Sequence, residues 1–127
     1  MSTPSRLLGS ILLCALLAAG IGPPENSLRP LWDGETFEGW HRQGGGSWAI
    51  EDGVLIGSHE ADEERHGHLI TDETFEDFRL RVRYKAVRGN SGLYFRVEEV
   101  GGVVGVHGFQ AEIDPRRDVG GLYETGG

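Results

Sequence analysis

Planar hydrogen-bonding side chains recur at alternate positions in two short stretches of the chain, "LYFRVEE" and "FQAEID". They include Arg96, Gln110, Glu112 and Asp114. Residues two apart on a strand point to the same face, so each stretch would gather these groups on one side. Guanidinium, amide and carboxylate groups are fork-shaped and recognise polyhydroxylated or acidic ligands. The spacing therefore predicts a ligand-binding face on two strands.

The strands that would carry these groups are marked by alternating apolar and polar residues. In "DFRLRVRYKAV", apolar residues alternate with Arg and Lys from Phe78 to Ala86, which predicts a half-buried antiparallel strand. A turn at Gly89-Asn90 is expected to lead into a returning strand, "SGLYFRVEE". The two faces predicted for that strand are Leu93, Phe95 and Val97 on one side, and Tyr94, Arg96 and Glu98 on the other.

The next predicted strand, "FQAEID", repeats the alternation. Its inward residues are expected to be Phe109, Ala111 and Ile113, and its outward residues Gln110, Glu112 and Asp114. This alternation predicts that Arg96 and Glu112 lie side by side on one polar face.

The rest of the chain is rich in turn signals. "WAIEDGVLIG" predicts a hairpin, because Asp52-Gly53 suits positive φ at both central positions of a tight turn. "HLIT" is a further short strand, and "LWDGETFEGWHRQGGGSW" predicts a strand edge and an aromatic loop. No segment after the N-terminal stretch has helical periodicity. Short strands between regular turns predict an all-β fold, an antiparallel two-sheet sandwich or jelly roll.

Residues 1–20 resemble a secretory signal peptide, and residues 21–30 a linker that contains proline. Arg6 precedes the apolar run "LLGSILLCALLAAGIG", and Ala18-Ala19-Gly20 supplies small residues for cleavage. A spanning helix needs about 20 apolar residues, more than this run has. An uncleaved anchor and, through Cys14, a lipoprotein are the alternatives. We expect a periplasmic or secreted protein without a membrane segment in its mature form.

Cleavage after residue 20 would remove the only cysteine and one arginine, and would leave 11 basic and 20 acidic residues, a net charge of −9. Such a surface disfavours nucleic acid and anionic membranes as partners. Without a disulfide, the fold depends on its core alone. Residues 31–127 are expected to be the N-terminal part of one domain, because "DVGGLYETGG" has no closing element.

Several blocks resemble the 3-keto-disaccharide hydrolase domain family. "LWDGETFEGW" is similar to that family's opening "LFDGKTLDGW", and "WAIEDGVLIG" to its "EDGVL" hairpin. "LITDETFEDFRLRVRYK" resembles its third block, "NSGLYFR" its "NSGVFFR", "GFQAEID" its "GYEVQI.D" and "GGLYE" its "TGALY". The blocks keep their order over residues 31–124. A later block around a Trp-Asn pair is missing from this chain.

The resemblance implies a concanavalin A-like jelly roll and an exported hydrolase that acts on 3-keto-glycosides or 3-keto-disaccharides. A ketone at C3 acidifies the C2–H, so a base can remove that proton, the C1 substituent leaves, and water adds. Such a site needs a base, a stabiliser of the enolate oxygen and donors to sugar hydroxyls. No cofactor is certain, although a divalent metal would also stabilise an enolate.

The candidate bases are Glu112, Asp114 and His107, and the candidate substrate-binding residues are Asn90, Tyr94, Arg96 and Gln110. Each has a plainer interpretation. Arg96 and Glu112 would also suit a cross-strand ion pair, Asn90 and Asp114 turns, and His107 a surface loop. His66 and His68 resemble a metal-binding pair or a solvated loop. For the whole protein, a non-catalytic carbohydrate-binding module is the main alternative, and a structural or adhesive surface domain is a third.

Overall fold

The computed structural model describes residues 28–114 and 118–126. The chain divides into two units, residues 1–32 and 33–127, and each is described by itself. In the first unit, the described residues 28–32 form no strand or helix. The predicted signal peptide and most of the predicted linker lie outside the described residues.

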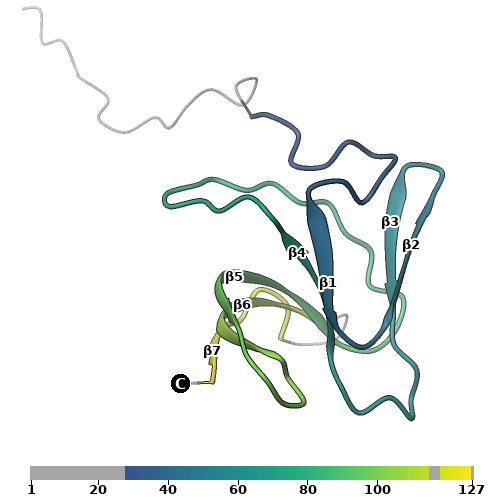
Figure 1. The fold of residues 1–127 in the computed structure, drawn as a ribbon, viewed down its shortest axis with the longest axis vertical. Coiled ribbons are helices and arrows are strands. Elements are labelled where there is room, and N and C mark those ends of the chain that lie inside the picture. The colour runs from purple at the N-terminus through teal and green to yellow at the C-terminus, as the bar shows by residue number, and fades with distance from the viewer. Residues whose placement is uncertain (1–27, 115–117, 127) are drawn as a thin grey trace, which may run out of the picture. The chain divides into compact units, whose positions relative to one another are not determined.

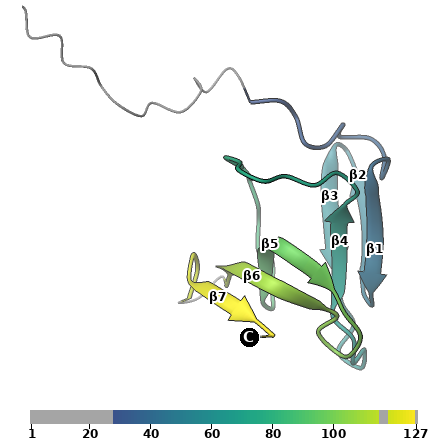
Figure 2. The same cartoon turned by 60° about the vertical axis from the view of Figure 1, so that its left-hand side comes forward.

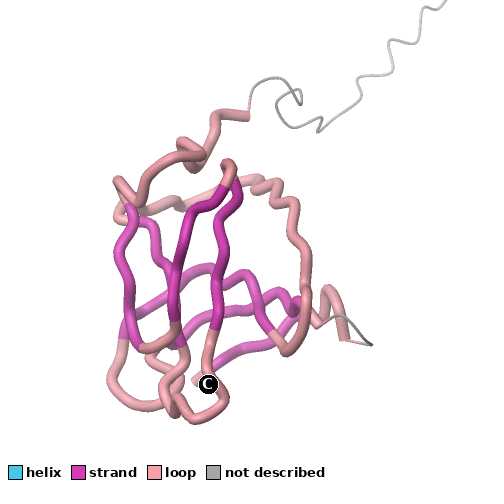
Figure 3. The backbone as a smooth tube through the Cα atoms, turned by 90° about the vertical axis from the view of Figure 1, so that its right-hand side faces the viewer, coloured by secondary structure: helices cyan, strands magenta, loops and turns pink. Residues whose placement is uncertain are grey.

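The second unit is built from short strands, and its described residues form no helix (Figures 1 and 3). The strands are β1 (Trp40–Gly44), β2 (Ser47–Glu51), β3 (Val54–Ser58), β4 (Gly67–Thr71), β5 (Ser91–Glu99), β6 (Val106–Ile113) and β7 (Leu122–Thr125). No helix in the described part of the chain is long and apolar enough to cross a membrane.

The strands form three antiparallel sheets, with β1 beside β4, β2 beside β3, and the order β5-β6-β7 in the third (Figure 2). The predicted hairpin at Asp52-Gly53 is confirmed, because Asp52 has φ 49° and Gly53 has φ 72° between β2 and β3. The all-β, antiparallel class is confirmed as well. The jelly roll is a finer statement that this strand order does not by itself show.

The strand predicted from Phe78 to Ala86 is wrong. The described residues form no strand between Thr71 and Ser91, and Figure 3 draws this stretch as loop. Its apolar side chains are largely exposed, with 49% for Phe78 and 51% for Tyr84. The predicted hairpin from this segment into β5 is therefore absent from the described sheets, and β5 pairs with β6 instead. Alternation alone does not supply the neighbouring strand that a half-buried strand requires.

The predicted burial of β6 is also reversed in part. Phe109, expected inward, is 36% exposed, whereas Glu112 and Asp114, expected outward, are each 8% exposed. Within the described residues, Val106 is the one buried hydrophobic side chain. Val106 begins β6, and the other enclosed side chain of the strand is the polar Glu112 near its C-terminal end, so hydrogen bonding matters there as much as apolar packing.

A glycine turn between β1 and β2 is hydrogen-bonded to the segment that precedes β4. Gly44 and Gly46 have φ of 83° and 75°, a region that favours glycine. The Gly45 N–H donates to the His66 carbonyl over 2.9 Å, and the Gly46 N–H donates to Glu63 Oε1 over 2.6 Å. These bonds bring the turn so close to Gly67 that a Cβ there would overlap the backbone of Gly45.

We predict that Gly67→Ala lowers the stability of the protein by about 1–3 kcal/mol, the usual cost of overpacking, because the clashing atoms are backbone and cannot rotate away. Gly101→Ala is the matched control, since nothing lies within 4 Å of its Cβ position. Urea denaturation of both variants measures the effect. Equal midpoints for the two variants would contradict this close packing.

Candidate functional site

A polar cluster surrounds Glu112, the buried acid of β6. Asn90 Nδ2 donates to Glu112 Oε1, and Gln110 Nε2 donates to Oε2 over 2.6 Å. Each carboxylate oxygen thus has one neutral amide donor. These two donors hold the carboxylate of Glu112 in a fixed orientation. Three of the residues predicted from sequence, Asn90, Gln110 and Glu112, come together here.

Gly92 makes room for this arrangement. It pairs with Glu112 across β5 and β6, so the two residues occupy neighbouring positions on one face. The Gln110 side chain passes over Gly92 to reach Glu112, and a Cβ on Gly92 would overlap Gln110 Cγ and Nε2. The third residue of the "NSG" stretch is therefore glycine for a steric reason.

A row of three side chains crosses the sheet next to this cluster. Tyr94 pairs with Gln110, and Gln110 pairs with Tyr123, so all three lie on the face of Glu112. The shared face of Tyr94 and Gln110 was predicted, but Tyr123 was not, since its short "GGLYE" context carries no alternation. The Tyr94 ring meets the His68 ring edge to face, with centroids 5.3 Å apart. His68 was missed as a neighbour because it comes from β4.

Arg96 does not lie beside Glu112, contrary to the prediction, because Glu112 pairs with Gly92, four residues before Arg96 on β5. A bulge also changes the direction of the Arg96 side chain. Between Phe95 and Glu98 the register of β5 shifts, so that Arg96 and Val97 oppose the single residue Gly108. Such a bulge re-aims side chains. Arg96 has φ 52°, and its Nη2 donates to the Glu76 carbonyl over 3.2 Å. An even alternation in the sequence gives no sign of the extra residue.

The other two candidate bases lie at opposite ends of β6. Asp114 follows the last residue of the strand, 8% exposed, two positions beyond Glu112. His107 lies five residues before Glu112, or about 17 Å along an extended strand. Its exposed side chain borders a pocket of about 260 Å³, lined mainly by valines and glycines from 100 to 106. His107 and Glu112 therefore belong to separate parts of the surface.

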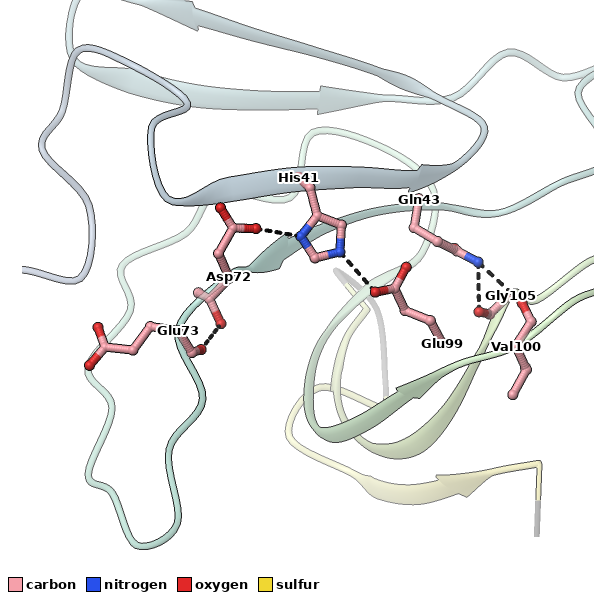
Figure 4. A network of polar contacts seen from close by, with 8 residues as sticks. His41, Gln43, Asp72, Glu73, Glu99, Val100 and Gly105 are labelled. Carbon is pink, nitrogen blue, oxygen red and sulfur yellow. Dashed lines mark hydrogen bonds and ion pairs between the residues drawn. The ribbon is translucent and has the colours of Figure 1, made fainter.

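Side chains of β1 and β4 hold the loop between β5 and β6, and Figure 4 shows the contacts made from β1. Gln43 Nε2 donates to the carbonyls of Val100 and Gly105, over 3.3 and 2.7 Å. His68 Nε2 donates to the Val104 carbonyl over 2.7 Å. We call this set of contacts the loop clamp. Because β5 and β6 carry the Glu112 cluster, the loop clamp ties that cluster to the β1-β4 sheet.

His41 completes the loop clamp through two carboxylates. Its Nδ1 lies 2.6 Å from Asp72 Oδ1, and its Nε2 lies 2.9 Å from Glu99 Oε1 (Figure 4). A protonated imidazole donates through both nitrogens. The hydrogen bond with Asp72, followed by that with Glu99, raises the pKa of His41 above its usual value near 6.5. The side chain is 41% exposed, so water screens part of this effect.

The sequence of His66 and His68 is compatible with a metal-binding pair or with a solvated loop, and the structure shows what these two residues contact. In the described part of the chain, no group of three or more His, Cys, Asp or Glu side chains is arranged to hold a metal ion. The ring Nε2 of His68 donates to the Val104 carbonyl, and the backbone N–H of His66 donates to the Val103 carbonyl over 2.9 Å. Both residues thus contribute to the loop clamp.

This geometry defines the chain as an all-β domain that carries, on one sheet face, a carboxylate held by two amide groups. The family model of the 3-keto-alpha-glucoside-1,2-lyase-like domain matches residues 27–127, and the chain belongs to this family. A 3-keto-disaccharide hydrolase of Bacteroides thetaiotaomicron is 35% identical over 79 residues, which cover 55% of this chain and 27% of that protein. The chain thus spans about a quarter of that relative's length. No solved structure matches.

We predict that His41 makes stability depend on pH. Its folded-state pKa is raised, so its contribution is fully present below the unfolded value near 6.5 and is lost as the pH rises through the folded value. Thermal melting of the parent protein and of His41→Gln should therefore show a difference in melting temperature that is largest below the usual pKa near 6.5 and shrinks as the pH rises above it. Glu99→Gln removes one of the two carboxylates, so His41 should still contribute to the pH dependence in that variant, but less than in the parent protein. A difference that stays constant with pH would contradict this role.

We predict that Gly92→Ala displaces the Gln110 amide from Glu112 Oε2, because the new methyl group would occupy the path of that side chain. The side-chain amide resonances of Gln110 in NMR spectra should shift, while those of Gln43 in the loop clamp stay in place. The same clash should lower the stability of the Gly92→Ala protein, and adding Gln110→Ala, which removes the clashing side chain, should recover most of that loss. Unchanged Gln110 resonances in the single variant would sink the prediction.

Proposed function

We propose that this protein cleaves the glycosidic bond of 3-keto-glucosides by elimination followed by hydration. The observation that carries the proposal is the family match over residues 27–127. The relative of 35% identity, named a 3-keto-disaccharide hydrolase, supports the same substrate class. The Glu112 cluster supplies a site at which the required base is held in a fixed position.

The reaction needs one proton to be removed and later returned. A base takes the C2 proton, and the electron pair of that bond forms an enolate with the C3 ketone. The enolate then collapses to a C1–C2 double bond and restores the ketone, while the C1 oxygen departs and takes up the proton that the base removed from C2. Water adds its oxygen to C1 and a proton to C2, which gives the free 3-keto sugar. A single carboxylate can serve as base and then as acid in such a sequence.

In this proposal Glu112 is the base. Two neutral amide donors orient its carboxylate, and a general base must be fixed within hydrogen-bonding reach of the proton that it removes. Asn90 and Gln110 act on Glu112 as positioning residues, which changes the direct sugar-binding role expected from sequence. Tyr94, in the same cross-strand row as Gln110, offers its hydroxyl to the sugar.

A carbohydrate-binding module is the main alternative, since the same polar face would bind sugars without a base. The two functions differ in what Glu112 must do. A module needs only an acceptor for hydroxyl groups, which a glutamine also supplies, and it would bind unoxidised glucosides as well as 3-keto-glucosides. An enzyme of the proposed kind needs the carboxylate itself.

We predict that Glu112→Gln lowers the rate of 3-keto-glucoside cleavage by the full-length protein roughly a hundredfold to ten-thousandfold, the usual contribution of a general base. The assay follows release of the C1 substituent. Glu124→Gln is the matched control, because Glu124 pairs with Phe109 and so lies on the opposite face of the sheet. Its rate should equal that of the parent protein.

Two outcomes would count against the proposal. Cleavage by Glu112→Gln at the parent rate would remove Glu112 from the chemistry. A parent protein that binds 3-keto-glucosides and unoxidised glucosides equally well and cleaves neither would favour the module. Thermal melting of each variant shows whether a lost rate reflects lost folding.

A further inference from the structure

Glycines flank Glu112 on both neighbouring strands. Gly92 is its partner on β5. On the other side, the Glu112 N–H donates to the Gly121 carbonyl, and the Gly120 N–H donates to the Glu112 carbonyl, each over 2.8 Å. Because Ala111 pairs with Leu122, Gly121 is the residue next to Glu112 on the β7 side. Neither neighbour raises a side chain on this face, so both leave space beside the carboxylate.

The two spaces are used by different side chains. Gln110 lies over Gly92 and donates to Glu112. Tyr123 folds back over Gly121, where a Cβ would lie 3.1 Å from Tyr123 Cε2 and 3.2 Å from its hydroxyl oxygen. The tyrosine hydroxyl is therefore directed toward the strand position adjacent to Glu112 and not away from the sheet.

Tyr123 is also the more accessible of the two tyrosines that flank Gln110. Its exposed fraction is 47%, whereas Tyr94 is half-buried with its ring against His68. A tyrosine combines a broad apolar ring with a hydroxyl that both donates and accepts hydrogen bonds. A sugar presents the complementary surface, C–H groups on one face and hydroxyl groups at its edge.

We propose that Tyr123 is a substrate-contacting residue of the Glu112 site, with its ring against the sugar and its hydroxyl bonded to a sugar oxygen. The inference rests on the proposed function, because it takes the sugar to lie over Glu112. It adds a residue on β7 to a site otherwise built from Asn90 and the strands β5 and β6. The sugar would thus lie across three strands, with Glu112 beneath the reacting carbon.

The test measures affinity apart from chemistry. In the full-length Glu112→Gln protein, calorimetric titration with a 3-keto-glucoside gives Kd without turnover. Adding Tyr123→Phe should weaken binding roughly three- to tenfold, the effect of one lost hydrogen bond. Adding Tyr123→Ala should weaken it more than about tenfold, since the ring contact is lost as well. In the otherwise unchanged protein, the same substitutions should raise KM.

Tyr84→Ala is the matched control, because Tyr84 is 51% exposed and lies in the segment without strands before β5. Its Kd should equal that of the Glu112→Gln protein alone. An unchanged Kd in both Tyr123 variants would overturn the inference, even if the protein cleaves 3-keto-glucosides as proposed. If Kd depends on Tyr123 but the parent protein does not cleave 3-keto-glucosides, the sugar contact is supported and the proposed enzyme is rejected. Absence of any sugar binding would overturn both.

Discussion

The contact on which the arrangement depends most is the loop clamp between β1, β4 and the loop that joins β5 to β6. The β1-β4 pair and the β5-β6-β7 sheet share no strand ladder, so contacts outside the ladders, most of them from side chains, connect them. Gln43 and His68 do so by donating to loop carbonyls, and His41 does so through Glu99. Within the described residues the buried hydrophobic core is a single valine, and these polar contacts therefore carry much of the connection.

The clamp includes a close approach that only glycine permits. Gly105 has φ 82°, and a Cβ there would lie 2.6 Å from Gln43 Oε1. The amide can thus reach both ends of the loop. The Glu112 cluster repeats the principle, since Gly92 and Gly121 leave room for Gln110 and Tyr123. Both polar arrangements in this domain are therefore set by where side chains are missing as much as by where they are present.

The sequence was most informative where one local rule decides the structure. Asp52-Gly53 fixed a tight hairpin, and the run from Ser91 to Glu99 became β5 with the same bounds. Reasoning from alternation failed where the outcome depends on a neighbour. The segment from Phe78 to Ala86 has a regular pattern but no strand beside it in the described structure. The bulge at Arg96 likewise depends on the partner strand, which has only Gly108 opposite two residues.

The candidate site followed the same division. Gln110 and Glu112 could be placed on one face from their spacing, and the structure adds that Asn90 joins them from the start of β5. His68 and Tyr123 could not be placed, because both reach that face from other strands. The acceptors of the loop clamp determine which residues of the loop can be substituted. Within the loop the acceptors are backbone carbonyls, so these hydrogen bonds do not depend on which side chains the loop carries. Val103, 54% exposed, and Gly101, with open space around it, are therefore positions at which labels or new recognition groups can be introduced without altering the hold on the loop.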